Sequence, residues 1–216
     1  MRKILLAICF GLIPVIAPAG AWLREQGTGF FSSSVYLIDP NSGGNHYAGL
    51  YLEYGVAPRL TLGLDLGRGV SGNTKTIGFL KFPIGSTQGP HHVALDLGFG
   101  EIAGNPTFRP GLSYGRGFSS RFGDGWISLE TAIELNLRDE TSDFKADLTF
   151  GLNRDDRHKI MLQLQSGKAV GDPPFLRLVP AVTRAIGNGW LLERGVTQEV
   201  TGGTASGLKF SLWRDF

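Results

Sequence analysis

The sequence predicts an all-β fold, a closed antiparallel transmembrane β-barrel of twelve strands that follows a cleaved signal peptide. Three observations lead to this prediction. Apolar and polar residues alternate with a period of two along most of the chain, as in 60–67, where leucine alternates with Thr, Gly, Asp and Gly. Beyond residue 21, no segment keeps apolar residues at helical spacing for three turns. The polar side of the strands is rich in small residues with single charges, which suits a confined interior better than a solvated surface.

Twelve segments carry the alternation, and short stretches rich in Gly, Pro, Asn, Asp and Ser separate them. Transmembrane strands need about 9–11 residues, so all connections are short. The segments form one domain, because no linker, repeat or low-complexity tract interrupts them. The expected strands are 27–39, 46–57, 60–70, 74–84, 91–102, 107–117, 125–137, 143–153, 157–166, 174–186, 189–200 and 205–216.

The first 21 residues have the three parts of a secretory signal peptide. Arg2 and Lys3 are followed by an apolar stretch over 4–17 and by a small-residue cleavage site over 19–21. The apolar stretch is shorter than the ~20 residues of a membrane-spanning helix. We expect cleavage after Ala21, so that the barrel occupies 22–216.

Removal of 1–21 changes the chemistry that remains. It takes away the only cysteine, Cys9, and two of the 21 basic residues, which leaves 19 basic against 19 acidic residues and a formal net charge of 0 instead of +2. No basic cluster remains to neutralise phosphates. Nucleic acid is therefore not an expected partner, and neither a disulfide nor thiol chemistry is expected.

A soluble β-barrel also alternates, so the distribution of the other residues has to separate the two classes. Aromatic residues near the strand ends suggest the interfacial girdles of a membrane barrel. A closed barrel is also the only sheet that leaves no unpaired edge in hydrocarbon. A soluble periplasmic β-barrel remains the alternative. The aromatic residues in question are Phe30, Phe31, Tyr47, Phe118, Phe122, Trp126, Trp190, Trp213 and Phe216.

The end of the chain adds a resemblance. Leu208, Phe210, Leu212 and the terminal Phe216 lie on one face of the last expected strand. This strand resembles the C-terminal strand of bacterial outer-membrane β-barrel proteins, which their barrel-assembly machinery recognises, although Arg214 stands where a hydrophobic residue is usual. The resemblance concerns the class and no specific family. It implies the outer membrane of a Gram-negative bacterium, with membrane lipids and the assembly machinery as partners, and it places the C-terminus on the periplasmic side.

Strand parity places a set of charged residues of both signs inside the barrel. Two interpretations stay open: a narrow channel for small polar solutes or ions, and a structural or interaction barrel whose lumen is closed by salt bridges. Twelve strands lie between the eight that side chains fill and the 16–18 that leave an aqueous pore. The expected lumen-lining residues are Glu53, Asp65, Lys75, Lys81, Asp96, Arg109, Glu130, Glu134, Lys145, Asp147, Lys159, Arg177 and Lys209.

Candidate catalytic and cofactor motifs are weak. A G-x-G-x-x-G pattern over 67–72 leads into another strand and not into the helix that would hold a pyrophosphate. His91 and His92 are adjacent, so a strand would point them to opposite faces and keep them from sharing a metal ion. An outer-membrane lipid hydrolase, the third functional hypothesis, would need a serine and a histidine placed together, and no local serine motif suggests one. We therefore expect no enzyme, cofactor or metal, and the oligomeric state stays open.

One strand breaks the pattern. In 189–200, the parity that puts the glutamates inside puts Arg194 outside, about 10 Å into an apolar band ~25 Å tall. Two remedies are possible. A β-bulge at Gly195 could turn Arg194 inward, which we favour. Alternatively, Arg194 and Arg214 could lie at a contact between protomers.

Overall fold

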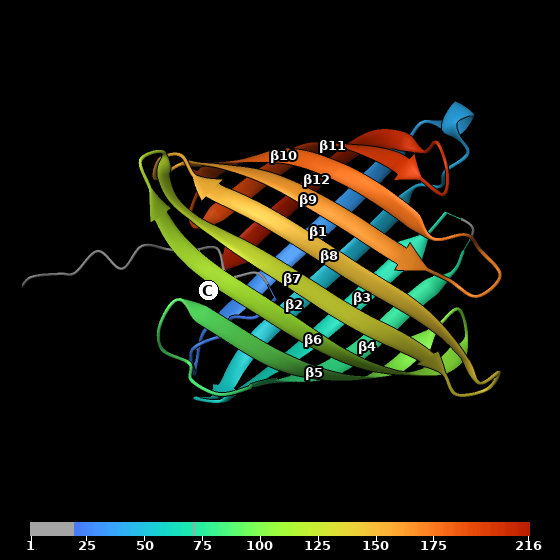
Figure 1. Ribbon diagram of the computed structural model, residues 1–216, viewed down its shortest axis with the longest axis horizontal. Coiled ribbons are helices and arrows are strands. Elements are labelled where there is room, and N and C mark those ends of the chain that lie inside the picture. Colours follow the sequence, from blue (N-terminus) through green and yellow to red (C-terminus); the bar gives the residue numbers. More distant parts are fainter. Residues whose placement is uncertain (1–19, 71) are drawn as a thin grey trace, which may run out of the picture.

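The computed structural model describes residues 20–70 and 72–216, which form a closed antiparallel barrel of twelve strands (Figure 1). The prediction of an all-β, twelve-stranded barrel is confirmed. The part of the expected signal peptide that spans 1–19 lies outside the described residues. The strands are β1 (Gly29–Ile38), β2 (Tyr47–Ala57), β3 (Leu60–Gly69), β4 (Thr74–Pro83), β5 (His91–Ile102), β6 (Asn105–Ser120), β7 (Gly123–Asn136), β8 (Thr141–Asn153), β9 (His158–Lys168), β10 (Phe175–Gly187), β11 (Trp190–Thr201) and β12 (Ser206–Asp215).

Each strand pairs with its neighbours in the sequence, and β1 pairs with β12 to close the ring. The closing register places Ile38 opposite Gly207 and Phe30 opposite Asp215. Beyond β12, the backbones of Gly29 and Phe216 exchange hydrogen bonds of 2.6 and 2.9 Å. We call the end of the barrel where these two residues meet the terminal end.

Two strands extend further than expected. Pairing between β6 and β7 continues to Ser120 opposite Gly123, so that only two residues form the turn. The serines and glycines of this hairpin have the composition of a loop, and apolar alternation stops before them. The backbone ladder nevertheless continues, because pairing needs no particular side chain.

The two faces of the sheet reverse the arrangement of a soluble protein. Thr61 inside the barrel is fully buried, whereas its neighbour Leu62 on the outer face is 45% exposed. Glu53, Lys81 and Glu193 are likewise buried inside. Apolar side chains dominate the outward positions, so the barrel presents an apolar belt to its surroundings and keeps most of the charges of its strands in the interior.

Several aromatic side chains also point inward, which corrects part of the girdle prediction. Trp126 is 1% exposed and forms an interior cluster with Met161 and Ala181, against which Trp22 and Trp213 pack. Phe30 and Tyr47 also face the lumen, where they line a cavity. These residues lie near strand ends, as an interfacial girdle requires, but their side chains point into the lumen and not towards the membrane.

Glycines on neighbouring strands make room for some of the interior rings. A Cβ atom on Gly63 would lie 1.9 Å from the Phe79 ring, and one on Gly151 would lie 2.1 Å from the Trp126 ring. Each ring therefore occupies the space that a side chain at the opposite glycine would need.

The connections are short at both ends of the barrel. The single described helix is η1 (Pro40–Ser42), a 3₁₀ turn between β1 and β2. Asp39 caps it by accepting a hydrogen bond from the amide of Asn41, and Gly43 ends it at φ +81°, a conformation that favours glycine. No helix of the described residues is long and apolar enough to cross a membrane.

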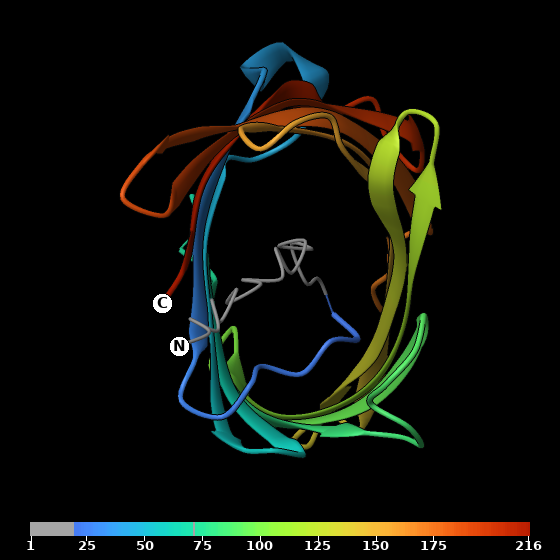
Figure 2. The same ribbon diagram turned by 90° about the vertical axis from the view of Figure 1, so that its left-hand side faces the viewer.

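Residues 20–28 form an N-terminal segment that lies across the inside of the barrel near its terminal end (Figure 2). Backbone hydrogen bonds of 2.8 and 2.9 Å connect Gly27 and Thr28 with Gly55 of β2. Before this anchor, Ala21 and Arg24 are buried and Trp22 is partly buried. The chain therefore enters its own lumen before it begins β1.

The predicted bulge at Gly195 is wrong. Arg194 pairs regularly with Val182 of β10 and with Phe210 of β12, and Gly195 continues the same register. The β10–β11 irregularities lie instead between Leu176 and Arg177 and between Ala185 and Gly187. Glu193 is fully buried inside, so regular alternation leaves Arg194 exposed on the outer face.

Candidate functional site: the lumen

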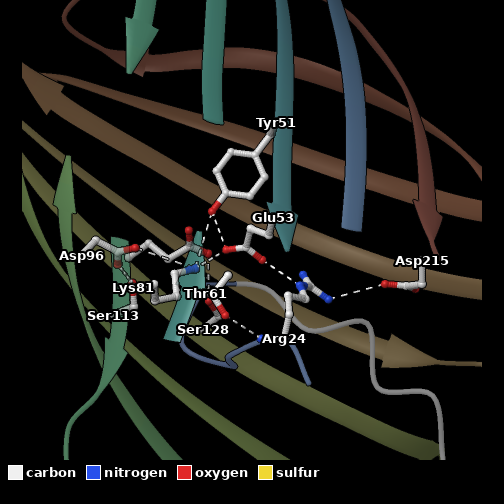
Figure 3. Close-up of polar contacts among 10 residues, drawn as sticks. Arg24, Tyr51, Glu53, Thr61, Lys81, Asp96, Ser113, Ser128 and Asp215 are labelled. Atoms are coloured by element: carbon white, nitrogen blue, oxygen red, sulfur yellow. Dashed lines mark hydrogen bonds and ion pairs between the residues drawn. The ribbon is translucent and has the colours of Figure 1, made fainter. Parts of the chain in front are cut away.

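Charged side chains from β2, β4 and β5 converge with the N-terminal segment inside the barrel (Figure 3). We call Arg24, Tyr51, Glu53, Lys81 and Asp96 the Arg24 cluster. The strands contribute these residues at inward positions, where the small side chains beside them leave space for longer ones. The cluster lies towards the terminal end, because Arg24 also reaches Asp215 of β12 at 3.4 Å.

Glu53 is the centre of the cluster. One of its carboxylate oxygens accepts a hydrogen bond from Nε of Arg24 at 2.7 Å. The other accepts from the hydroxyl of Tyr51 at 2.7 Å and from Nζ of Lys81. Glu53 is 1% exposed, so two cations and a phenol together replace the water that a carboxylate needs.

Lys81 extends the cluster to β5 and β6. Its Nζ lies 3.8 Å from the carboxylate of Asp96, which in turn accepts a hydrogen bond of 3.3 Å from Ser113. The network therefore spans β2, β4, β5 and β6 and braces one side of the barrel.

Arg24 is the functional residue that strand parity missed. It carries the N-terminal segment into the cluster: its amide donates to Thr61 at 3.0 Å, and its guanidinium lies 4.5 Å from the centre of the Phe30 ring. Arg24 itself is only 5% exposed. Alternation assigns faces only to strands, so a charged residue in an irregular segment gave no signal of its position.

A second network lies farther from the terminal end. Asp65 of β3 accepts from Lys75 at 2.7 Å and from Arg109 of β6. On the next wall, Lys145 pairs with Glu134 at 2.7 Å, and Lys145 is half exposed. The side chains of these pairs border the open space in the middle of the barrel.

The opposite wall carries fewer charges. Lys209 of β12 pairs with the buried Glu193 at 2.8 Å and donates to Gln163 at 3.0 Å. Arg177 pairs with Glu199 at 2.7 Å. Between these pairs the wall carries hydroxyl and amide side chains together with Met161 and Trp213. Ser34 is hydrogen-bonded to Ser211 at 2.8 Å.

The remaining residues of the predicted lumen set are Glu130, Asp147 and Lys159. Glu130 of β7 lies directly opposite Asp147 of β8 and accepts a hydrogen bond of 3.1 Å from Ser128. Nζ of Lys159 lies 5.8 Å from the centre of the Trp126 ring. The structure thus brings most of the predicted residues into five groups of ion pairs and leaves the two facing acids beside open space.

That open space comprises adjoining cavities. One of about 180 Å³ is lined by the Asp65 network and by Glu134 and Lys145. Another of about 340 Å³ lies beside Arg24, Tyr36 and Gln163. The two share Tyr51, Asp65, Glu130 and Asp147. A third, of about 330 Å³, lies beyond Arg24 at the terminal end, against Trp22 and His92.

Arg24 lines both the second and the third cavity. The N-terminal segment therefore separates the space inside the barrel from the space at its terminal mouth. Polar groups line the cavities on both sides of this segment, so water and small polar molecules would find hydrogen-bonding partners in each cavity.

The residues of the predicted assembly signal lie at the closing seam. Leu208, Phe210 and Leu212 are exposed on the outer face of β12. The Phe216 ring covers Gly29, where an added Cβ would lie 2.4 Å from it. Recognition of these residues by the assembly machinery stays a prediction.

The histidines form no catalytic or metal-binding group in the described part of the chain. His46 accepts from the amide of Ile38 at 2.9 Å, and His91 is bonded to Tyr114 at 2.8 Å. His158 is bonded to Asp155 at 2.9 Å, and no serine of residues 20–70 or 72–216 is hydrogen-bonded to a histidine. The described residues also contain no group of three or more His, Cys, Asp or Glu that could hold a metal ion.

Comparison with known proteins identifies the fold. No family model matches the sequence, and no curated protein matches it. Several solved structures match the fold of this chain. The KdgM porin superposes with a TM-score of 0.64 at 8% identity, covering 87% of this chain and 99% of that one. The COG4313 outer membrane channel from Pseudomonas putida F1 superposes with a TM-score of 0.56 at 11% identity, covering 92% and 99%.

A further structure, the KdgM porin in complex with disordered oligogalacturonate, has a TM-score of 0.65 at 9% identity, with 87% of this chain and 99% of that one covered. This chain therefore has the barrel fold of these outer-membrane channel proteins over nearly their whole length. At such low identity the likeness concerns the fold.

Proposed function

We propose that this protein is a narrow channel for small polar solutes in the outer membrane of a Gram-negative bacterium. The observation that carries the proposal is the polar space within a closed barrel whose outside is apolar. An apolar belt around a closed sheet suits hydrocarbon. The solved structures with the same fold, described as a porin and a channel, support the same class.

The lumen suggests what could pass. Most of its charges are paired with a charge of the opposite sign, as Glu53 is with Arg24 and Lys81, so the walls carry little unbalanced charge. Hydroxyl, amide and aromatic side chains line most of the rest. We infer a preference for small, uncharged or weakly charged polar solutes, with weak ion selectivity.

The N-terminal segment would be the narrowest part of the path. Arg24 fastens it to Glu53, Thr61 and Asp215, which lie on β2, β3 and β12. A segment held at several points across one mouth reduces the free cross-section. The channel is therefore expected to have a small conductance.

The second candidate is a structural or interaction barrel with a closed lumen. The same Arg24 cluster favours it, because a segment bound by buried ion pairs could close the terminal end completely. Conductance in planar lipid bilayers separates the two. The processed protein should give small open steps, and a deletion of 22–26 should give larger ones.

Two single variants sharpen this experiment. Arg24→Gln loses the ion pairs that fasten the segment and should increase the conductance in the same direction as the deletion. Arg154→Gln, in the exposed turn between β8 and β9, changes the net charge equally and should leave the conductance unchanged. Folded protein that stays silent both as wild type and after the deletion would show a closed barrel and reject the channel.

Membrane insertion would require the assembly machinery and outer-membrane lipids as partners. We infer that the outer face of β12 and Phe216 provide the recognition signal. Replacing Phe216 with Ser should lower the amount of folded protein in outer membranes in cells more than it lowers refolding into detergent. Equal effects in both settings would assign Phe216 a purely structural part through its contact with Gly29.

A further inference from the structure

Three arginines point outward from consecutive strands near the terminal end of the barrel. Arg184 belongs to β10, Arg194 to β11 and Arg214 to β12, and we call them the arginine row. Arg184 pairs with Leu192, two positions from Arg194. Arg214 pairs with Trp190, four positions from Arg194. The three strands are neighbours in the ring, in the order β10, β11, β12.

None of the three has an acidic partner within the described structure. The guanidinium of Arg214 lies 5.2 Å from the centre of the Trp190 ring. Across the outward positions of the twelve described strands, the one acid is Glu101, at the opposite end of the barrel beside the last residue of β5. The surface around the row is apolar: Val182 and Phe210 flank Arg194 directly.

An arginine on the lipid face is costly at the middle of the membrane and inexpensive near the headgroups. Its long side chain can extend along the apolar wall and bring the guanidinium to the polar boundary. Trp190 marks that boundary, because tryptophan prefers the interface. Arg194 lies deeper than Trp190 and would direct its guanidinium back towards it, where Arg214 already lies.

We propose that the arginine row is a binding site for the phosphate group of an anionic phospholipid in the periplasmic leaflet. A guanidinium forms two parallel hydrogen bonds to a phosphate, which Arg does better than Lys. The acyl chains of the same lipid would lie on Leu192, Leu212 and Val182. The lipid thus supplies the counter-charge that the protein does not provide on this face.

A second copy of the chain is a poorer occupant. Copies in one membrane share the same orientation, so the partner would present its own outward positions at the depth of the row. Near the terminal end, the outward positions of the described strands contain no Asp or Glu. Charge complementarity therefore selects a lipid phosphate.

Native mass spectrometry of the delipidated protein tests the site. Phosphatidylglycerol is added back, with phosphatidylcholine as the uncharged comparison and inorganic phosphate as the lipid-free anion. Wild type should retain phosphatidylglycerol preferentially. Each Arg→Gln change in the row should weaken retention about fivefold, while Arg194→Lys should lose less. Arg68→Gln, an outward arginine of β3 at the opposite end, should change nothing.

Several results would overturn the proposal. Equal retention of phosphatidylglycerol by wild type and by the Arg184/Arg194/Arg214→Gln variant would show that the arginine row is not the binding site. Binding of inorganic phosphate as tight as that of phosphatidylglycerol would show a simple anion site instead. Dimers that vanish with Arg194→Gln would show a second copy as the occupant. Conductance should be the same in Arg194→Gln and in wild type, so the outcome is independent of the proposed channel.

Discussion

Arg24 and Arg194 are arginines on the two sides of the barrel wall, the first in the N-terminal segment inside it and the second on the outer face of β11. Inside the barrel, Arg24 reaches Glu53, Asp215 and the ring of Phe30, and it is buried. Outside, Arg194 lies exposed between Val182 and Phe210 without an acid near it. The comparison teaches that the protein compensates most of its interior charges with its own residues and leaves an exterior charge to its surroundings.

The largest expected effect comes from breaking the interior compensation. Glu53→Gln leaves Arg24 and Lys81 buried without their shared carboxylate, which should lower the free energy of unfolding by about 3–5 kcal/mol. Denaturant unfolding in lipid vesicles, followed by tryptophan fluorescence, measures the loss.

The matched control for this change is Glu134→Gln. Its partner Lys145 is half exposed and stays hydrated when the carboxylate is lost, so the cost should be about 1 kcal/mol or less. Similar losses for both variants would mean that burial does not distinguish the two interior pairs.

The second effect concerns the two faces of one strand. Leu148 of β8 lies mid-strand on the outer face, so Leu148→Arg should lower the unfolding free energy by roughly 2–4 kcal/mol in lipid. Its neighbour Thr149 borders the 340 Å³ cavity, where an arginine finds polar surroundings, and Thr149→Arg should cost clearly less. Equal costs in a vesicle refolding assay would contradict the assignment of faces. Gly63 is unsuitable as an interior control, because the Phe79 ring fills the space beside it.

The smallest effect lies outside the membrane, in the turn between β8 and β9. The amide of Arg157 donates to Asp155 and, with the bond from His158, lowers the pKa of its carboxyl. Because the pKa of this carboxyl is lower in the folded protein than in the unfolded chain, the ionised group stabilises the fold above the usual aspartate pKa of about 3.9. This stabilisation is lost as the pH falls through the pKa of the folded protein. Wild type should therefore lose slightly more thermal stability below about pH 4 than Asp155→Asn does. A steeper acid loss in the Asn variant would reverse this assignment.

The strands of the barrel wall and their inward faces could mostly be predicted from the sequence. Alternation reveals both the strand and its inward face, because the side-chain period of a strand is two whatever surrounds it. Leu62 and Thr61 show this directly: the first is exposed and the second fully buried. The same parity would have corrected the girdle prediction, since Trp126 shares its face with Glu130 and Glu134, which were already expected inside.

Contacts between distant segments were beyond the sequence. Arg24 precedes β1 in an irregular stretch, so no periodicity indicates that it meets Glu53, 29 residues further on. Arg194 gave the opposite difficulty. Its parity is clear, but the cost of an exposed arginine in an apolar wall favours a bulge, which the structure does not have. Regular pairing of the backbone took precedence, because a ladder broken between β10 and β12 would leave peptide groups unpaired.

The interior rings that face glycines, Phe79 opposite Gly63 and Trp126 opposite Gly151, have a consequence for how such a barrel can change over evolutionary time. Its bore is set by a few side chains and not only by the number of strands. Exchanging one ring for alanine would widen the passage while every hydrogen bond of the wall stayed in place. A new cargo could thus be accommodated by one or two codon changes, without the insertion of a hairpin that a larger barrel would require.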